Sequence, residues 1–492
     1  MYLSRYYFFV LLFITSTNAH YEHSGRDDLT KEDELRVKQV TQIKYDLEKY
    51  ESLSGGAATS NAIPSINSYS FASANLDFEG KQKFQIGNGL FTKLWVSSPS
   101  STKASDGLGP LFNARSCQRC HLKDGRGHPP VNNNDLKVSM LMQLSVHEKS
   151  TMTTDYVVPK PDPVYGFQLQ DNAVAGISSE GTFTIDYTEE SIELNGGELV
   201  FLRTPQYNFK NLRYGDFHKD TKFSPRVAQQ MIGMGLLEAI HENDIIALSD
   251  PMDLNHDGIS GRVSWIYDEG FTQKKLGRFG WKATNPTVIE QSASAFFHDM
   301  GLSSKLKSDP FGDCTNNQTK CINALHGNDN DYEVPNNFLD FVTFYAKNLA
   351  VPKRRDVSSK KVLAGKRIFF DAGCGSCHNP KFVTSRNAKN KAHQFQLIWP
   401  YTDLLLHDMG PELSDNRPFG SASASEWRTP PLWGIGLTEL VSGHTSFLHD
   451  GRARNLKEAI LWHGGEGARS RDYFKKLPQD SRENLIEFLN SL

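Results

Sequence analysis

The chain has 492 residues, which is enough for two or three domains with sizeable cores. Its formal net charge is −3 and it contains no long basic tract, so the composition gives no support for nucleic-acid binding. Cysteine is scarce, with six residues, and four of these fall in two copies of one short motif.

Residues 1–19 have the pattern of a secretory signal peptide. Arg5 supplies the positive start, and Tyr6–Ser16 is an apolar run too short to span a bilayer. Small residues then precede a cleavage point near His20, and no later stretch reaches membrane-spanning length. The sequence therefore predicts an exported protein with no stable membrane span, which in a bacterial cell lies in the periplasm.

Residues 20–75 form a polar segment without a recognisable motif. Leu29–Tyr50 is charged and has the composition of a polar helix, whereas Gly55–Ser73 has the Ser/Gly/Ala/Asn composition of a linker. We therefore expect the first folded domain to begin near residue 76.

The first copy of the cysteine motif is Cys117-Gln-Arg-Cys120-His121. Its Cys-x-x-Cys-His spacing is that of a c-type haem attachment site. The two thiols bond to vinyl groups on one edge of the porphyrin, and His121 then lies below the iron as its proximal ligand. A zinc knuckle half-site or a thioredoxin-like redox pair is the alternative for a single copy. A zinc site requires further Cys or His pairs nearby, and a redox pair does not require the histidine.

The second copy is Cys374-Gly-Ser-Cys377-His378. Even one copy is expected by chance on the order of 10⁻³ times per chain at this composition. Each copy follows a similar stretch, Gly87–Phe91 before the first and Gly365–Phe370 before the second. These stretches resemble the N-terminal helix of small cytochrome c domains. We therefore predict two covalently bound haem c groups.

The expected fold is mainly α, with cytochrome c-like haem domains at residues 76–345 and 346–492. Within the first domain, residues from about 150 to 215 differ from the rest in their residue pattern. Polar and apolar residues alternate in Thr182–Asp186, and apolar residues cluster in Leu199–Leu202. Gly, Asp and Asn residues lie between these stretches, as they do between short strands. We predict a small β-rich insertion here. A wall of the first haem pocket, a lid and a partner surface are all compatible with its sequence.

A calcium loop is one interpretation of Asp253-Leu-Asn255-His-Asp257-Gly258. Oxygen donors at alternate positions, followed by glycine, are typical of the start of a loop that binds Ca²⁺. The bidentate glutamate expected at loop position 12 is missing, because Ser264 stands there. A polar turn without metal is the alternative.

Two cysteines, Cys314 and Cys321, lie outside the haem motifs. In an oxidising compartment, two cysteines at this spacing predict a small-loop disulfide. Two free structural thiols are the alternative.

Several stretches of the chain resemble the bacterial di-haem oxidoreductase family often labelled thiol oxidoreductase, a relative of the di-haem cytochrome c peroxidases and of MauG. The resemblance runs from about residue 76 to the C-terminus, through residues 106–127, 234–240, 257–262, 277–283, 348–355, 426–436 and 449–465. It implies a periplasmic protein with two haems and mostly helical cytochrome c domains. The residues give no support to the thiol label, since haem attachment would consume the motif thiols.

In these relatives, a helix after His-Asp-Gly carries the distal ligand of the second haem, which is Met in the peroxidases and Tyr in MauG. The corresponding residue here is His463, so the resemblance implies that His378 and His463 ligate the same iron. Asn455 is placed to cap this helix and Gly464 to end it. Two histidine ligands would lower the potential and close this iron to substrate. A core histidine is the alternative.

The relatives also use a glutamate on the distal side of the reactive haem. Glu238, an acid within the apolar segment Met234–Ile240, is the candidate for this catalytic role at the first haem, where burial would raise its pKa. The alternative is a structural hydrogen bond to the backbone or to Arg226. Trp281 is either an electron relay or a core residue, and His298 either bonds a haem propionate or is structural.

These motifs predict a di-haem oxidoreductase that resembles a peroxidase. The first haem would react with peroxide or another oxidant, and the second would store or transfer electrons from a small redox protein or a small-molecule donor. A pure electron-transfer cytochrome and a haem-bearing binding or maturation module are the alternatives. An open first iron beside an acid–base group would distinguish the enzyme from the electron carrier.

Overall fold

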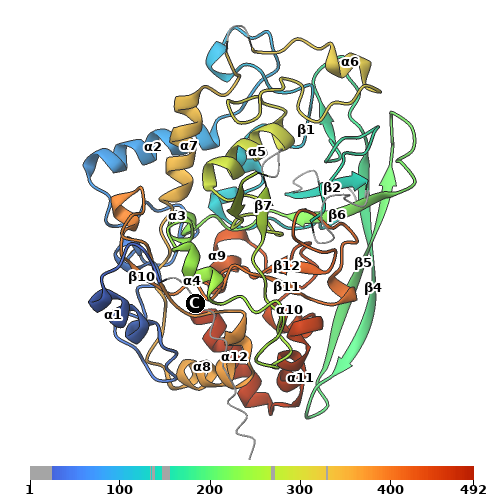
Figure 1. Cartoon of the computed structure of the whole chain (residues 1–492). Helices are drawn as coiled ribbons and strands as arrows, with labels where there is room; N and C mark the ends of the chain where they lie inside the picture. Colours follow the sequence, from blue (N-terminus) through green and yellow to red (C-terminus); the bar gives the residue numbers. More distant parts are fainter. Residues whose placement is uncertain (1–24, 133–134, 136–138, 147–155, 268–271, 329–330) are drawn as a thin grey trace, which may run out of the picture.

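A computed structural model of the chain describes residues 25–132, 135, 139–146, 156–267, 272–328 and 331–492 (Figure 1). The expected signal peptide, residues 1–19, lies outside the described residues. Within the described ranges, the helices are all too short or too polar to cross a membrane.

Helices account for 30% of the chain and strands for 18%, so helix prevails, but less than the expected mainly α fold implies. The helices are α1 (Lys31–Thr41), α2 (Phe78–Thr92), α3 (Met234–Glu238), α4 (Glu242–Ile246), α5 (Val288–Met300), α6 (Thr319–Ile322), α7 (Asn336–Lys347), α8 (Lys360–Asp371), α9 (Thr438–Ser442), α10 (Leu456–Leu461), α11 (Ala468–Lys476) and α12 (Gln479–Ser491).

The strands of the described chain pair only in antiparallel twos: β1 with β3, β2 with β6, β4 with β5, β7 with β8, β9 with β10, and β11 with β12. Their bounds are β1 (Leu111–Phe112), β2 (Met140–Val146), β3 (Asn172–Ala173), β4 (Thr182–Glu193), β5 (Leu199–Lys210), β6 (Thr221–Val227), β7 (Trp265–Tyr267), β8 (Lys274–Leu276), β9 (Phe382–Val383), β10 (Leu397–Ile398), β11 (Leu406–Asp408) and β12 (Glu426–Arg428).

Two crossing helix pairs repeat along the chain, α2 with α7 and α8 with α12. Each pair approaches most closely at a glycine. A Cβ on Gly87 of α2 would lie 2.2 Å from the Phe341 carbonyl oxygen, and one on Gly365 of α8 would lie 1.9 Å from that of Asn484. Because glycine has no Cβ, the paired helices meet backbone to backbone. These are the glycines that precede the two haem motifs in the sequence, so both motifs follow equivalent helical frames.

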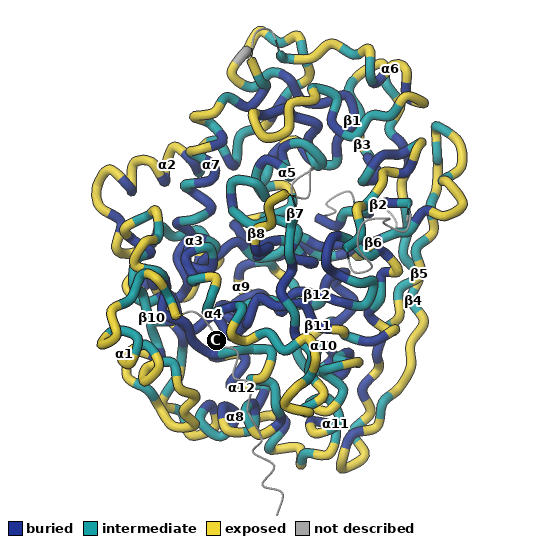
Figure 2. Tube along the Cα trace, viewed as in Figure 1, coloured by how far each residue is buried: buried dark blue, intermediate teal, exposed yellow. Residues whose placement is uncertain are grey.

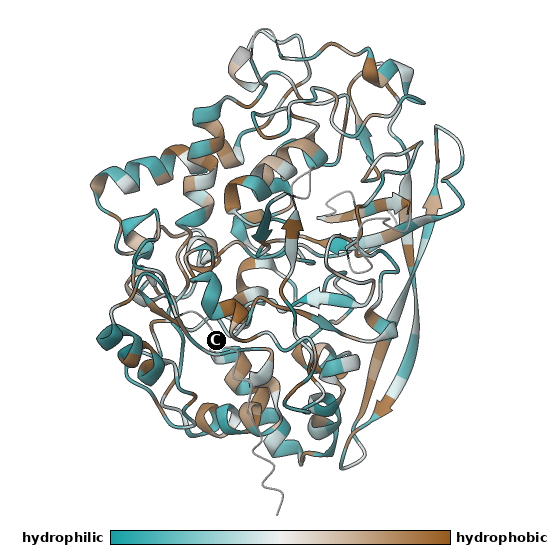
Figure 3. Cartoon of the chain, viewed as in Figure 1, coloured by the Kyte–Doolittle hydropathy of each residue, from teal (hydrophilic) through white to brown (hydrophobic). Residues whose placement is uncertain are grey.

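The predicted β-rich insertion contains a long hairpin that runs along one side of the molecule (Figure 1). β4 and β5 pair over their full lengths. Phe183 and Phe209 near the open end pack on the core below β2. At the far end the Asn195 N–H donates to the Lys475 carbonyl at 2.9 Å. The hydrophobic start of β5 there (Figure 3) joins the cluster that contains Phe369 and Phe488, so the hairpin connects the core of β2 with that cluster.

The segment expected to be a linker is packed into the fold. Tyr69 is fully buried, and its hydroxyl donates to the Gly434 carbonyl at 2.5 Å. The Ser73 N–H donates to the Asn348 carbonyl at 2.8 Å. Small side chains allow this close packing, whereas composition alone suggested flexibility. The outer helix α1, by contrast, contains no buried residue (Figure 2).

Each of the two largest hydrophobic clusters packs against one of the cysteine motifs, through Cys117 in the first and Cys374 in the second. The first contains Phe84 and Phe91 of α2, and the second contains Phe369 of α8 and Phe488 of α12. β12 lies near the centre of the molecule and is buried along its whole length (Figure 2).

Candidate haem sites

The first motif presents a histidine that is prepared to ligate a metal through one nitrogen. The His121 Nδ1 lies 2.8 Å from the Gln229 carbonyl oxygen, to which it donates. Burial lowers the pKa of His121 to about 4, so the imidazole is neutral. A neutral imidazole whose Nδ1–H is held by a carbonyl keeps its Nε2 lone pair for iron.

The second motif repeats this arrangement. The His378 Nδ1 donates to the Tyr401 carbonyl at 2.9 Å, and burial lowers the pKa of His378 to about 4. A phenylalanine from the preceding helix faces each ring: Phe91 lies 6.4 Å from His121 and Phe369 lies 6.3 Å from His378, between ring centroids. The proximal sides of the two sites are therefore built alike.

The four motif cysteines are free of disulfides, as haem attachment requires. Burial raises the pKa of both Cys117 and Cys374 to about 12, which disfavours the thiolate form that zinc binds. Among the described residues, the group of three potential metal ligands that does occur, at Asp27, Asp28 and His241, includes neither motif. The donor set fits covalent haem better than zinc.

The first motif opens onto a large cavity. Its volume is about 1160 Å³, which is somewhat above the usual range of ligand cavities in proteins and leaves room for a porphyrin. Cys117, Cys120 and His121 line it, together with most residues of α5. Residues 158, 159, 161–163 and 166–168 of the predicted insertion also line it, so part of the insertion forms a wall of this cavity.

The second motif opens onto a narrower cavity that also contains His463. His378 and His463 both line it, and so does Met409. His463 follows α10, where Asn455 caps the helix as the sequence suggested, and its Nδ1 donates to the Ala459 carbonyl at 2.7 Å. Its Nε2 is thereby left for a ligand. The structure brings both histidines to one cavity, as a shared iron requires.

Met409 is a candidate ligand that the sequence interpretation missed. It lies in the stretch 406–410, which the sequence repeats at 297–301. That repeat was a signal for a haem-facing segment, but a thioether is also a common core residue.

The two cavities are adjacent. Trp281 and Arg428 line both of them, together with Gln229, Gln230 and Pro431. The Trp281 Nε1–H donates to the Val227 carbonyl at 2.9 Å, which fixes the indole ring between the cavities.

Glu238 does not line the first cavity, although its neighbours Met234 and Leu237 do. Its carboxylate accepts the Val288 N–H at 2.7 Å and pairs with the Lys347 ammonium. The carboxylate therefore holds the start of α5, which is the structural alternative, though with partners other than Arg226. The predicted catalytic role of Glu238 has no support from this position.

His298, by contrast, is a titratable side chain that does line the first cavity. Its Nδ1 lies 2.9 Å from both carboxylate oxygens of Asp313, and a quarter of its side chain is exposed. The Gln168 and Gln170 side chains donate to its carbonyl oxygen at 3.3 and 2.7 Å. The ring is thus fixed through both its side chain and its backbone.

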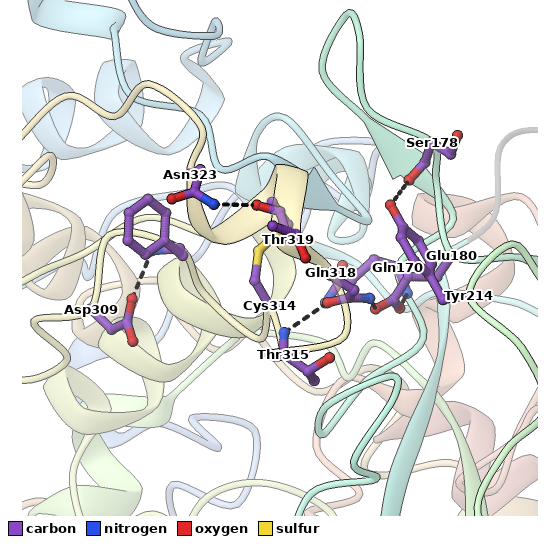
Figure 4. Close-up of a disulfide and its surroundings, with 12 residues drawn as sticks. Gln170, Ser178, Glu180, Tyr214, Asp309, Cys314, Thr315, Gln318, Thr319 and Asn323 are labelled. Atoms are coloured by element: carbon purple, nitrogen blue, oxygen red, sulfur yellow. Dashed lines mark hydrogen bonds between the residues drawn. A yellow bond between two sulfur atoms is a disulfide. The ribbon is translucent and has the colours of Figure 1, made fainter.

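Cys314 and Cys321 form a disulfide (Figure 4). Asp313 directly precedes Cys314 in the sequence. Within the closed loop, Gln318 accepts the Thr315 N–H at 2.8 Å and donates to the buried Glu180 at 2.5 Å. The loop is therefore tied internally and to the insertion, so Asp313 is held firmly against His298.

The candidate calcium loop has its oxygen donors occupied by its own backbone. Asp253 accepts the Gly258 N–H at 3.2 Å, and Asn255 accepts the Asp257 N–H at 2.9 Å. Asp257 in turn accepts the Ile259 N–H at 2.9 Å. This is the geometry of the polar turn. Nothing in it supports calcium.

A family model described as "Di-haem oxidoreductase, putative peroxidase" matches residues 49–492. No curated protein matches the chain. The matched range includes both haem motifs, both helix pairs and both cavities. The chain therefore belongs to the di-haem oxidoreductase family, as an enzyme with two c-type haem sites.

Proposed function

We propose that the protein reduces peroxide or a similar oxidant at its first haem site and that the second site stores or transfers the electrons. The observation that carries this proposal is the difference between the cavities. The narrow second cavity offers His463 and Met409 as additional ligands beside His378. The first cavity is wide, and its second histidine, His298, is paired with a carboxylate.

When bound, the first haem supplies an iron that can coordinate the oxidant and exchange electrons with it. The chain itself orients this group through His121, whose Nδ1–H is held by Gln229. Conversion of peroxide to water also requires proton movement between the two oxygens. His298 is suited to this task because Asp313 fixes its Nδ1 and leaves Nε2 for the proton exchanged with the oxidant.

Electrons would reach the first site through the boundary between the cavities. Trp281 lies on this boundary with its ring fixed by Val227, so it is the candidate relay. The donor is a small redox protein or a small molecule, and the expected export signal puts both in the periplasm.

Stopped-flow mixing with peroxide tests the proposal in wild type, His298→Gln and Glu238→Gln. We expect His298→Gln to react about 10²-fold more slowly, the usual scale for a general acid–base group. Glu238→Gln is the matched control and should retain the wild-type rate, because its carboxylate lies outside the cavity.

Two results would overturn the proposal. If wild type fails to react with peroxide, even after partial reduction, the protein is an electron carrier. If His298→Ala converts a low-spin first haem to high-spin, His298 is an iron ligand and both irons are six-coordinate.

A further inference from the structure

A buried cluster of charges borders the first cavity, and its positive charges exceed its negative ones. Asp415 is its carboxylate, and the Lys282 ammonium lies 3.1 Å from it with both side chains fully buried. The Arg226 guanidinium lies 3.8 Å from Asp415, and Arg417 is 1% exposed. Three cations thus surround one anion, and we call these four residues the cationic cluster.

Two of these cations reach the first cavity with donors that lack an acceptor. Arg226 of β6 and Arg417, which precedes β12, both line the cavity. Among the described residues, the Arg226 Nη2 and the Arg417 Nε have no hydrogen-bond partner, and the Arg226 Nη2 is the atom that lies 3.8 Å from Asp415, beyond hydrogen-bond distance. Other Arg417 donors reach Gln143 and the Leu144 carbonyl, each at 3.2 Å, so the guanidinium is held in place.

Other arginines of the same cavity are satisfied. Arg278 donates to the Leu237 and Ile240 carbonyls at 3.0 and 2.8 Å. Arg428 donates to the Gly280 carbonyl at 3.0 Å and to Gln229 at 2.7 Å. Among the arginines that line this cavity, the missing acceptors are therefore specific to Arg226 and Arg417.

Such a cluster is unfavourable without a further anion. Removing a charge from water is unfavourable unless the charge is paired and hydrogen-bonded. Burial lowers the pKa of Arg226 to about 10 and that of Arg417 to about 9, because a charged guanidinium is less stable away from water. An anion in the cavity would stabilise the charged form.

We propose that Arg226 and Arg417 together form a carboxylate-binding site in the first cavity. A guanidinium offers donors in a planar fork that matches the two oxygens of a carboxylate. The carboxylate comes either from a propionate of the first haem or from a soluble carboxylate. The site depends on the haem cavity and is independent of the reaction with peroxide.

The test uses the haem-loaded protein as wild type, Arg226→Gln, Arg417→Gln and the matched control Arg278→Gln. Resonance Raman spectra of the ferric proteins report the bending bands of the haem propionates, which respond to hydrogen bonding. In parallel, acetate is titrated against chloride at constant ionic strength, and the thermal unfolding midpoint is followed.

A shift of the propionate bands in Arg226→Gln and Arg417→Gln, with Arg278→Gln unchanged, identifies a haem propionate as the occupant. If the propionate bands are unchanged, the occupant is a soluble carboxylate provided that acetate stabilises the wild type and Arg278→Gln. Both cluster variants should then have lost this stabilisation.

Wild-type bands in both cluster variants, with no stabilisation by acetate beyond that by chloride, overturn the proposal. If the cluster variants fail to fold, wild type alone decides. The bending bands of hydrogen-bonded propionates shift when H₂O is replaced by D₂O. If the bands of the wild-type protein do not shift and acetate does not stabilise it, the proposal is refuted.

Discussion

The helix crossing beside the first haem motif makes a sharp prediction about two glycines of α2. At Gly87, an added Cβ would lie 2.2 Å from the Phe341 carbonyl oxygen and 2.7 Å from the Tyr345 Cβ. At Gly89, two residues further along the same helix, an added Cβ meets nothing within 4 Å. Alanine at these two positions changes helix propensity equally but changes packing at Gly87 alone.

The expected magnitudes follow from these contacts. Alanine is favoured over glycine inside a helix by about 1 kcal/mol, so Gly89→Ala should stabilise the protein by about that amount. At Gly87, α2 and α7 would have to separate by roughly 1 Å to restore van der Waals distance. Overpacking of this kind costs about 1–3 kcal/mol, and a clash with backbone belongs at the upper end. The variants should therefore differ by about 3 kcal/mol.

Urea unfolding of the haem-loaded variants, followed by far-ultraviolet circular dichroism, measures this difference. Phe91 gives a second signal, because it follows Gly87 by one helical turn and faces the His121 ring. The spectrum of the first haem should therefore change in Gly87→Ala and remain unchanged in Gly89→Ala. If both substitutions stabilise the protein to the same extent, the helices do not cross at Gly87 and the reasoning is wrong.

Three further predictions concern the sites. His463→Ala should convert the second haem from low-spin to high-spin while Met409→Leu leaves it low-spin, and the opposite pattern would make Met409 the ligand. Alanine at both Cys314 and Cys321 should lower the free energy of unfolding by about 2.5 kcal/mol, the chain-entropy value for an eight-residue loop, and an unchanged value would contradict it. Burial raises the pKa of Asp124 to about 6, so its contribution to stability is present below about pH 4 and is lost as the pH rises through 6. Asp124→Asn should remove this loss, on the order of 3 kcal/mol, and parallel pH profiles for variant and wild type would refute the assignment.

Features that depend on residues close together in the sequence were predictable. The spacing of Cys117 to His121 is itself the chemistry of haem attachment, and family membership supports two such sites. The alternation in Thr182–Asp186 and the cluster in Leu199–Leu202 correspond to β4 and β5. In these cases the determining contacts lie within one element or between two neighbouring ones.

Features that depend on distant partners were not predictable. The sequence favours Glu238 because its neighbours are apolar, but apolar neighbours indicate burial without indicating which surface a side chain faces. Its partners lie 50 positions away at Val288 and 109 positions away at Lys347. Likewise, His298 acquires its character from Asp313, which belongs to a loop whose position depends on the tertiary fold.

The two sites indicate where the difference between two haems of one chain arises. On the proximal side, His121 and His378 have the same carbonyl partner type, the same neutral state and the same phenylalanine neighbour. The attachment motifs and the proximal environments therefore give little reason for the two haems to differ in their chemistry. The difference lies in what each cavity places around the haem: further potential ligands in the second, and a carboxylate-paired histidine with unmatched buried cations in the first. Duplication of a domain can supply the attachment motif and the proximal environment twice. The groups that surround each haem must instead arise separately at each site.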